Sequence, residues 1–211
     1  MTGDNNIAMG SNAGNHITAS DTVSIGTNSL ATADSAIAMG LNSEAAGTNA
    51  TAAGSSAVAT GSNSSAYGMG SNASGESSVA IGDTSSASGT SSVAIGQGAV
   101  ATGDSNISIG ASSGTNVTGN QNTATGASSG QDVDGTLNTA SGAFSGRIVE
   151  GNNNTASGVS SGQSVTGSSN AAYGDTAGVE VEGSNNTATG ASSGFRVTTT
   201  TPRSALSAVG T

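Results

Sequence analysis

The chain has 211 residues and a formal net charge of −10, and its composition is not that of an ordinary globular domain: 34 residues are Gly, 2% are aromatic and 8% are charged. The three arginines (Arg147, Arg196 and Arg203) cannot form a basic patch, which makes nucleic acid and anionic membrane surfaces poor candidate partners. With no Cys and a single His (His16), a metal cluster or an imidazole-based triad cannot be built in one chain, so we expect no enzyme, no cofactor and no metal site.

Glycines recur along the chain at intervals of sixteen (once), fourteen (six times) and again sixteen (five times) residues: Gly10, Gly26, Gly40, Gly54, Gly68, Gly82, Gly96, Gly110, Gly126, Gly142, Gly158, Gly174 and Gly190. Such periodicity is typical of repeat architectures. We therefore predict one continuous β-roll over residues 1–197, with 14-residue coils at about 27–110 and 16-residue coils at about 11–26 and 111–197. Residues 198–211 are expected to leave the roll near Pro202.

The residues before these glycines alternate between bulky and small, as in Val79-Ala80-Ile81 and Val93-Ala94-Ile95. Alternation with β-branched residues is typical of strands, whereas the apolar residues of a coiled coil follow helical heptads. Each repeat is therefore predicted to form two short strands joined by turns, which is one coil of a parallel β-solenoid.

The small residues are predicted to point into the roll. Opposite them, the 14-residue coils carry Ala and the 16-residue coils carry Val, so that coil length and side-chain volume increase together and Val is expected to fill the wider interior. The predicted interior residues are Ala80, Ala87, Ala94, Ala101, Val117, Val133, Val149, Val165 and Val181.

The neighbours of the small residues must then point outward. They form an apolar band of Val23, Ile25, Ile37, Met39, Tyr67, Val79, Ile81, Val93, Ile95, Ile107 and Ile109. A band of this kind is larger than a soluble monomer normally exposes, and self-association is the simplest way to cover it. Beyond Gly110 the same positions become polar, as at Thr123 and Thr125.

The repeated Ser-Val-Ala-Ile-Gly (Ser78–Gly82 and Ser92–Gly96) and Ala-Thr-Gly (Ala59–Gly61 and Ala101–Gly103) resemble the heads of trimeric autotransporter adhesins, the YadA-like head family. The resemblance covers about Ile7 to Gly110. It implies an all-β, left-handed parallel β-roll, three copies of which pack side by side, with the apolar band as the trimer interface.

The resemblance further implies adhesion to host matrix or cell-surface molecules, autoagglutination, and a position on the bacterial cell surface. The chain is expected to be a head fragment, with membrane attachment only through parts of a parent protein outside it.

Acidic, aromatic and amide side chains add three further features to the sequence. Asp134 and Glu150 occupy the same register in adjacent coils, and we expect a solvated acidic face rather than a cation site. Phe144 replaces Ser at a turn close to Arg147, which makes this pair the candidate ligand contact. A column of Asn residues is expected to form an amide ladder that stabilises stacked turns: Asn122, Asn138, Asn154, Asn170 and Asn186.

The alternative function is ice binding through a Thr-rich flat face, with Thr123-Ala124-Thr125 and Thr187-Ala188-Thr189 as its elements. Ser141, Ser157 and the bulky Tyr173 interrupt this column. The adhesin head therefore remains the preferred interpretation.

Overall fold

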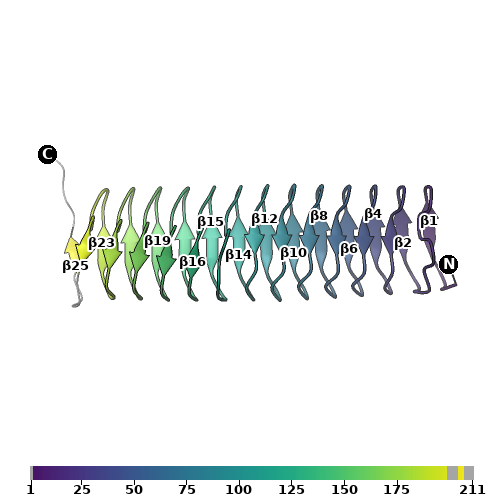
Figure 1. The fold of residues 1–211 in the computed structure, drawn as a ribbon, viewed down its shortest axis with the longest axis horizontal. Coiled ribbons are helices and arrows are strands. Elements are labelled where there is room, and N and C mark those ends of the chain that lie inside the picture. Colours follow the sequence, from purple (N-terminus) through teal and green to yellow (C-terminus); the bar gives the residue numbers. More distant parts are fainter. Residues whose placement is uncertain (1, 199–203, 207–211) are drawn as a thin grey trace. The chain divides into compact units, whose positions relative to one another are not determined.

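The computed structural model describes residues 2–198 and 204–206, and the regular elements assigned among these residues are all β-strands. The chain divides into two compact units, Met1–Thr102 and Gly103–Thr211. In each unit the chain winds in successive coils, and each strand pairs in parallel with the equivalent strand of the next coil (Figure 1). This arrangement is the parallel β-solenoid that the sequence predicts.

The first unit contains two parallel sheets, whose inward-facing alanines form one buried cluster. One sheet consists of β1 (Ile7–Met9), β2 (Val23–Ile25), β4 (Ile37–Met39), β6 (Thr51–Ala53), β8 (Ser65–Tyr67), β10 (Val79–Ile81) and β12 (Val93–Ile95). The other consists of β3 (Leu30–Ala31), β5 (Glu44–Ala45), β7 (Val58–Ala59), β9 (Asn72–Ala73), β11 (Ser86–Ala87) and β13 (Val100–Ala101).

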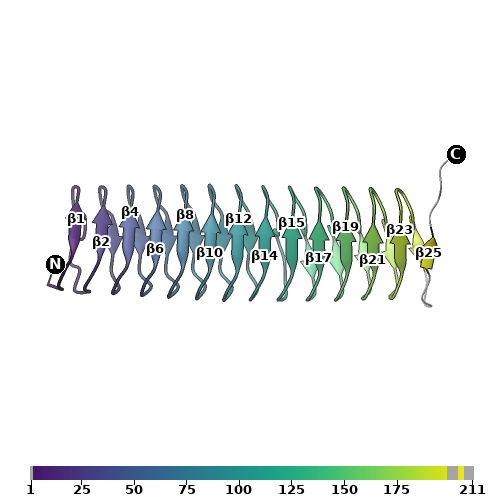
Figure 2. The same cartoon turned by 180° about the vertical axis from the view of Figure 1, so that it is seen from behind.

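The second unit repeats this plan of alternating three-residue and two-residue strands, with a longer connection after each three-residue strand. Figure 2 shows its successive coils from the other side. Its three-residue strands are β14 (Ile107–Ile109), β15 (Thr123–Thr125), β17 (Thr139–Ser141), β19 (Thr155–Ser157), β21 (Ala171–Tyr173), β23 (Thr187–Thr189) and β25 (Ser204–Leu206). Its two-residue strands are β16 (Val133–Asp134), β18 (Val149–Glu150), β20 (Val165–Thr166), β22 (Val181–Glu182) and β24 (Val197–Thr198).

The register of strand pairing places similar residues beside each other in successive coils. Val79 lies beside Val93 in the first unit, and Val133 lies beside Val149 in the second. Since successive side chains of a strand point to opposite faces, a three-residue strand turns its middle side chain inward and the other two outward, whereas a two-residue strand turns one side chain each way. All the side chains predicted for the interior are buried: Ala80, Ala87, Ala94, Ala101, Val117, Val133, Val149, Val165 and Val181.

The glycines that end the three-residue strands are required by the close approach of adjacent coils. At Gly82, φ is +127°, and an added Cβ would lie 2.6 Å from the carbonyl oxygen of Gly96 in the next coil. Residues with a side chain rarely adopt such a backbone conformation, and no side chain could fit in that space. The glycine periodicity of the sequence therefore marks the points of contact between coils.

The C-terminal strands differ from the expected departure of residues 198–211 from the roll. Val197 and Thr198 in β24 pair with β22, and Ser204–Leu206 in β25 pair with β23, so strand pairing continues on both sides of Pro202. Pro202 itself lies outside the described residues, as do the other residues of 199–203 and 207–211.

Candidate functional site

The outward side of the larger sheet in the first unit carries a column of apolar side chains, here called the apolar face. Strand pairing sets Ile81 beside both Tyr67 and Ile95, and Ile25 beside Met39. The residues of the apolar face are Val23, Ile25, Ile37, Met39, Tyr67, Val79, Ile81, Val93 and Ile95.

The side chains of the apolar face remain in contact with solvent in the single chain. Tyr67 is 43% exposed and Ile81 is 39% exposed, whereas Val79 and Val93 are half-buried. Ile107 and Ile109, which the sequence analysis assigns to the same band, belong to the second unit and are exposed there. A stacked column of exposed isoleucine, valine, methionine and tyrosine is typical of a surface that binds a partner.

Four exposed apolar residues of the first unit were not included in the predicted band. Ile7 and Met9 lie on β1 and pair with Val23 and Ile25, so the repeat itself could have identified them. Leu41 and Met69 follow the glycines that end β4 and β8, and both are exposed. The same turn position is polar in the other coils of the first unit, as at Ser55 and Asp83, and it lies outside the strands, so alternation within strands could not identify Leu41 and Met69.

In the second unit the equivalent outward column is rich in hydroxyl groups. Thr123 lies beside Thr139, which in turn lies beside Thr155. Tyr173 lies between Ser157 and Thr189 in the second outward column of the same sheet and is exposed. A bulky phenol therefore projects from the face that ice binding would require to be flat.

Acidic residues of the second unit lie on the outward side of the sheet that the two-residue strands form. Asp134 pairs in register with Glu150, and its Oδ1 accepts a hydrogen bond of 2.7 Å from Thr118 Oγ1. Glu180 Oε2 accepts a hydrogen bond of 2.7 Å from Arg196 Nε, in an ion pair that is open to solvent. Among the described residues, no cluster of three or more His, Cys, Asp or Glu side chains could hold a metal ion.

The candidate contact pair, Phe144 and Arg147, lies in one turn of the second unit. Phe144 is 45% exposed and adopts φ of +57°, a left-handed conformation that Ser128 and Ser160 also adopt in neighbouring coils. Arg147 is half-buried, and its Nε finds no hydrogen-bond partner within the described part of the chain. The exposed ring of Phe144 therefore lies three positions before Arg147, whose guanidinium has one nitrogen without a hydrogen-bond partner among the described residues.

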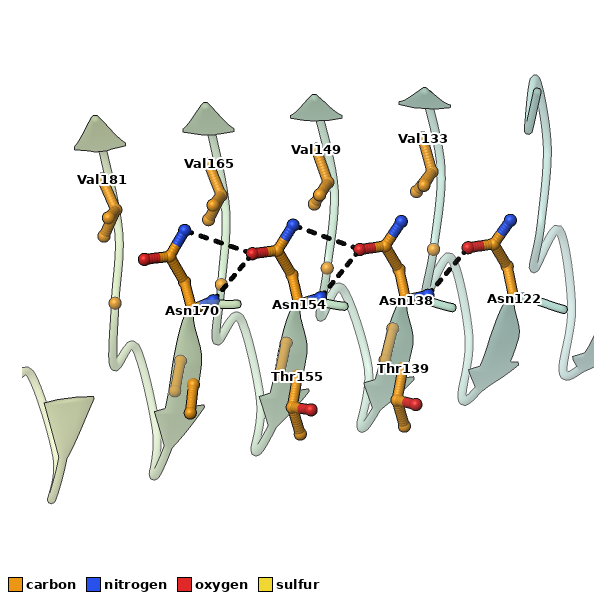
Figure 3. A pocket seen from close by; sticks show the side chains of 18 of the residues that line it. Asn122, Val133, Asn138, Thr139, Val149, Asn154, Thr155, Val165, Asn170 and Val181 are labelled. Carbon is orange, nitrogen blue, oxygen red and sulfur yellow. Dashed lines mark hydrogen bonds between the residues drawn. The ribbon is translucent and has the colours of Figure 1, made fainter. Parts of the chain in front are cut away.

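The asparagine column forms a ladder of amides inside the second unit (Figure 3). Asn154 Nδ2 donates to Asn138 Oδ1 (3.1 Å) and to the carbonyl oxygen of Gly167 (2.9 Å). Asn154 Oδ1 accepts hydrogen bonds from the backbone N–H (3.0 Å) and the Nδ2 (3.1 Å) of Asn170. The ladder extends to Asn106, and all its amides are buried.

A cavity of about 570 Å³ runs through the second unit between the asparagine ladder and the valine column. Figure 3 shows the amides pointing toward the valines, whereas Thr139 and Thr155 point away from them. The expectation that valine fills the wider interior is therefore wrong. The valines cluster only with one another and not with the alanines opposite them, so that a space remains between the two walls.

No helix in the described residues has the length and hydropathy of a membrane span. A search of curated proteins finds no match to the chain. The model of the YadA head domain repeat matches residues 18–43, 45–71, 73–99 and 87–113.

Among solved structures, the chain is similar to the crystal structure of the collagen-binding domain of the Yersinia adhesin YadA. The two are 22% identical in sequence, with a TM-score of 0.52, and the match covers 71% of this chain and 78% of that chain. This similarity supports the solenoid fold. Within residues 18–113, the matched segments are similar to the YadA head domain repeat.

Proposed function

We propose that the chain is the head of a bacterial surface adhesin that works as a homotrimer. The exposed, in-register apolar face carries this proposal, because it lies on the same strands that match the YadA head repeats. In the proposed assembly three left-handed rolls, with coils of 14 and 16 residues, pack side by side and bury this face. Ile107 and Ile109 of the second unit are also assigned to the interface, and the hydroxyl-rich column of that unit forms a more polar contact.

Burial of the apolar face supplies the driving force for assembly. A buried Ile or Val side chain stabilises by about 1.5–3 kcal/mol relative to an exposed one, and the face repeats such residues from coil to coil. Because the interior of the first unit consists mainly of alanine and serine, each roll has little apolar core of its own. Stability is therefore expected to depend on trimer formation and on protein concentration.

Sedimentation equilibrium of the full chain tests the assembly. The expected mass is three times the chain mass of 19.6 kDa. The double substitution Ile81→Asn and Ile95→Asn places two amides in the apolar face and is expected to yield monomers. The control Ser86→Asn adds the same amide to the other sheet, where Asn72 already stands beside it. A folded wild-type monomer at micromolar concentration would disprove the proposed interface.

The proposed activity is non-catalytic attachment to host matrix or cell-surface molecules, with self-recognition between bacteria as a second outcome. Collagen is the first ligand to test, because the similar structure is described as a collagen-binding domain. We assign the contact to Phe144 and Arg147, since exposed aromatic and arginine side chains dominate binding hot spots.

The equivalent positions in neighbouring coils supply conservative replacements. Phe144→Ser copies Ser128 and Ser160, and Arg147→Gln copies Gln131, so both keep the local turn. The double variant is expected to lose at least tenfold in binding to immobilised collagen while its mass in solution stays that of the trimer. Full binding by a trimeric double variant would remove this contact from the proposal, and failure of the wild type to bind would redirect the search to other matrix molecules.

A further inference from the structure

The interior of the second unit offers a binding site that the adhesin function does not use. Four columns of residues line the cavity: the valines of the two-residue strands, the alanines of the three-residue strands, the asparagine ladder, and glycines such as Gly130 and Gly146. An added Cβ at Gly146 would lie 2.7 Å from the Cβ of Ala140, so the cavity is closed on the glycine side. The remaining space lies between the asparagine and valine columns.

The dimensions of the cavity select a linear occupant. From Asn106 to Asn186 there are five intervals between coils, each about 4.8 Å, which gives a length of about 24 Å. A volume of about 570 Å³ over that length describes a cavity that is longer than it is wide. This shape suits an extended hydrocarbon chain better than a compact ring system.

The chemistry of the lining favours hydrocarbon over water. Val149 and Val165 present only methyl groups, and Ala140 and Ala156 add more. The amides of the ladder are the polar side chains along the middle of the cavity, and the donors of Asn154 are already used within the protein. Water in a cavity needs several polar partners, whereas apolar cavities stay dry and take up apolar molecules.

We propose that the cavity of the second unit holds one linear alkyl chain, such as that of a long-chain fatty acid. The chain runs parallel to the asparagine ladder, and its methylene groups contact the valine and alanine columns. It enters as the coils close around it during folding, because the strands on both sides of the cavity are hydrogen-bonded from coil to coil. The alkyl chain supplies the apolar core that the side chains of these coils leave incomplete.

Refolding of the full chain in the presence of a linear fluorescent fatty acid tests the proposal. The chain is unfolded in guanidinium chloride and refolded with cis-parinaric acid, and free probe is then removed. One probe molecule per chain is expected, with enhanced probe fluorescence and a higher melting temperature than for protein refolded alone. Palmitic acid is expected to compete strongly with the probe, whereas adamantane carboxylic acid, which is compact and can contact only a short part of the cavity, is expected to compete weakly.

Two variants locate the bound probe. Val149→Phe with Val165→Phe fills the cavity and is expected to reduce retained probe at least tenfold, with a higher melting temperature in the absence of any fatty acid. The control Thr166→Phe adds an aromatic ring next to Val165, on the outward side of the valine wall, and is expected to retain the probe. Val149→Leu with Val165→Leu repeats the test with smaller side chains if the phenylalanine variant does not fold.

The outcomes separate this proposal from the adhesin function. Retention of the probe by folded cavity-filling variants would show that the outer surface binds it and would overturn the proposal. Absence of retained probe in the wild type, or competition by adamantane carboxylic acid as strong as by palmitic acid, would overturn it too. Sedimentation equilibrium on the same samples reports the trimer independently, so a failure of one proposal is not mistaken for a failure of the other.

Discussion

The contact between coils at Gly82 allows the repeat geometry to be tested by adding one methyl group. Gly82→Ala forces a side chain into φ of +127°, where strain costs about 1–3 kcal/mol. The new Cβ would also lie 2.6 Å from the carbonyl oxygen of Gly96, and relieving such an overlap costs about another 1–3 kcal/mol. The substitution is therefore expected to lower the free energy of unfolding by about 2–6 kcal/mol.

Gly70→Ala is the matched control in the same unit. Gly70 has φ of +61°, and the nearest neighbour of an added Cβ is Thr84 Cγ2 at 3.6 Å, an ordinary contact. Only the left-handed conformation opposes this substitution, at about 1–2 kcal/mol. Urea unfolding followed by circular dichroism, at one fixed protein concentration, measures both variants. Equal destabilisation by the two substitutions would refute the argument that the glycines mark close contacts between coils.

Further expectations follow from burial and hydrogen bonding, each measured as a change in the free energy of unfolding. Asn154→Ala removes one amide from the buried ladder and should destabilise by about 1–3 kcal/mol, whereas the exposed Asn72→Ala should change stability by less than about 0.5 kcal/mol. Ala80→Leu should destabilise by at least about 1–3 kcal/mol, because Ala80 is fully buried among other alanines; a neutral result would contradict the close packing of the first unit. Arg196→Ala should cost no more than about 1 kcal/mol, since the ion pair with Glu180 is open to solvent, and a larger loss would assign this arginine a structural role.

The direction in which most side chains point could be predicted from sequence alone. The alternation of Val79, Ala80 and Ile81 requires that Ala80 face one way and its neighbours the other, and the larger residues cannot both fit inside a coil of this length. The structure buries Ala80 and leaves Ile81 exposed. The outward band was therefore visible before the fold was known, although alternation could not identify Leu41 and Met69 in the turns.

The cavity inside the 16-residue coils could not be predicted from the sequence. Coil length and the change from Ala to Val were both visible, and together they suggested a filled core. Whether Val149 reaches the opposite wall depends on the distance between two sheets, and that distance is fixed only when the turns at both ends of the coil close. The burial of the asparagine ladder was hidden for the same reason, since a column of Asn fits a surface turn as well as an interior wall.

The sequence by itself determined the repeat, the strands and the inward and outward columns, because these depend on local alternation and on the spacing of glycines such as Gly82 and Gly96. The tertiary structure alone decided how far apart the two sheets lie, and with it the cavity between Asn154 and Val165. The physical reason is that the alternation of side chains along a strand depends only on neighbouring residues. The volume of the cavity, in contrast, is the space enclosed by a coil minus the volume of the side chains that point into it, and this small difference depends on the whole coil.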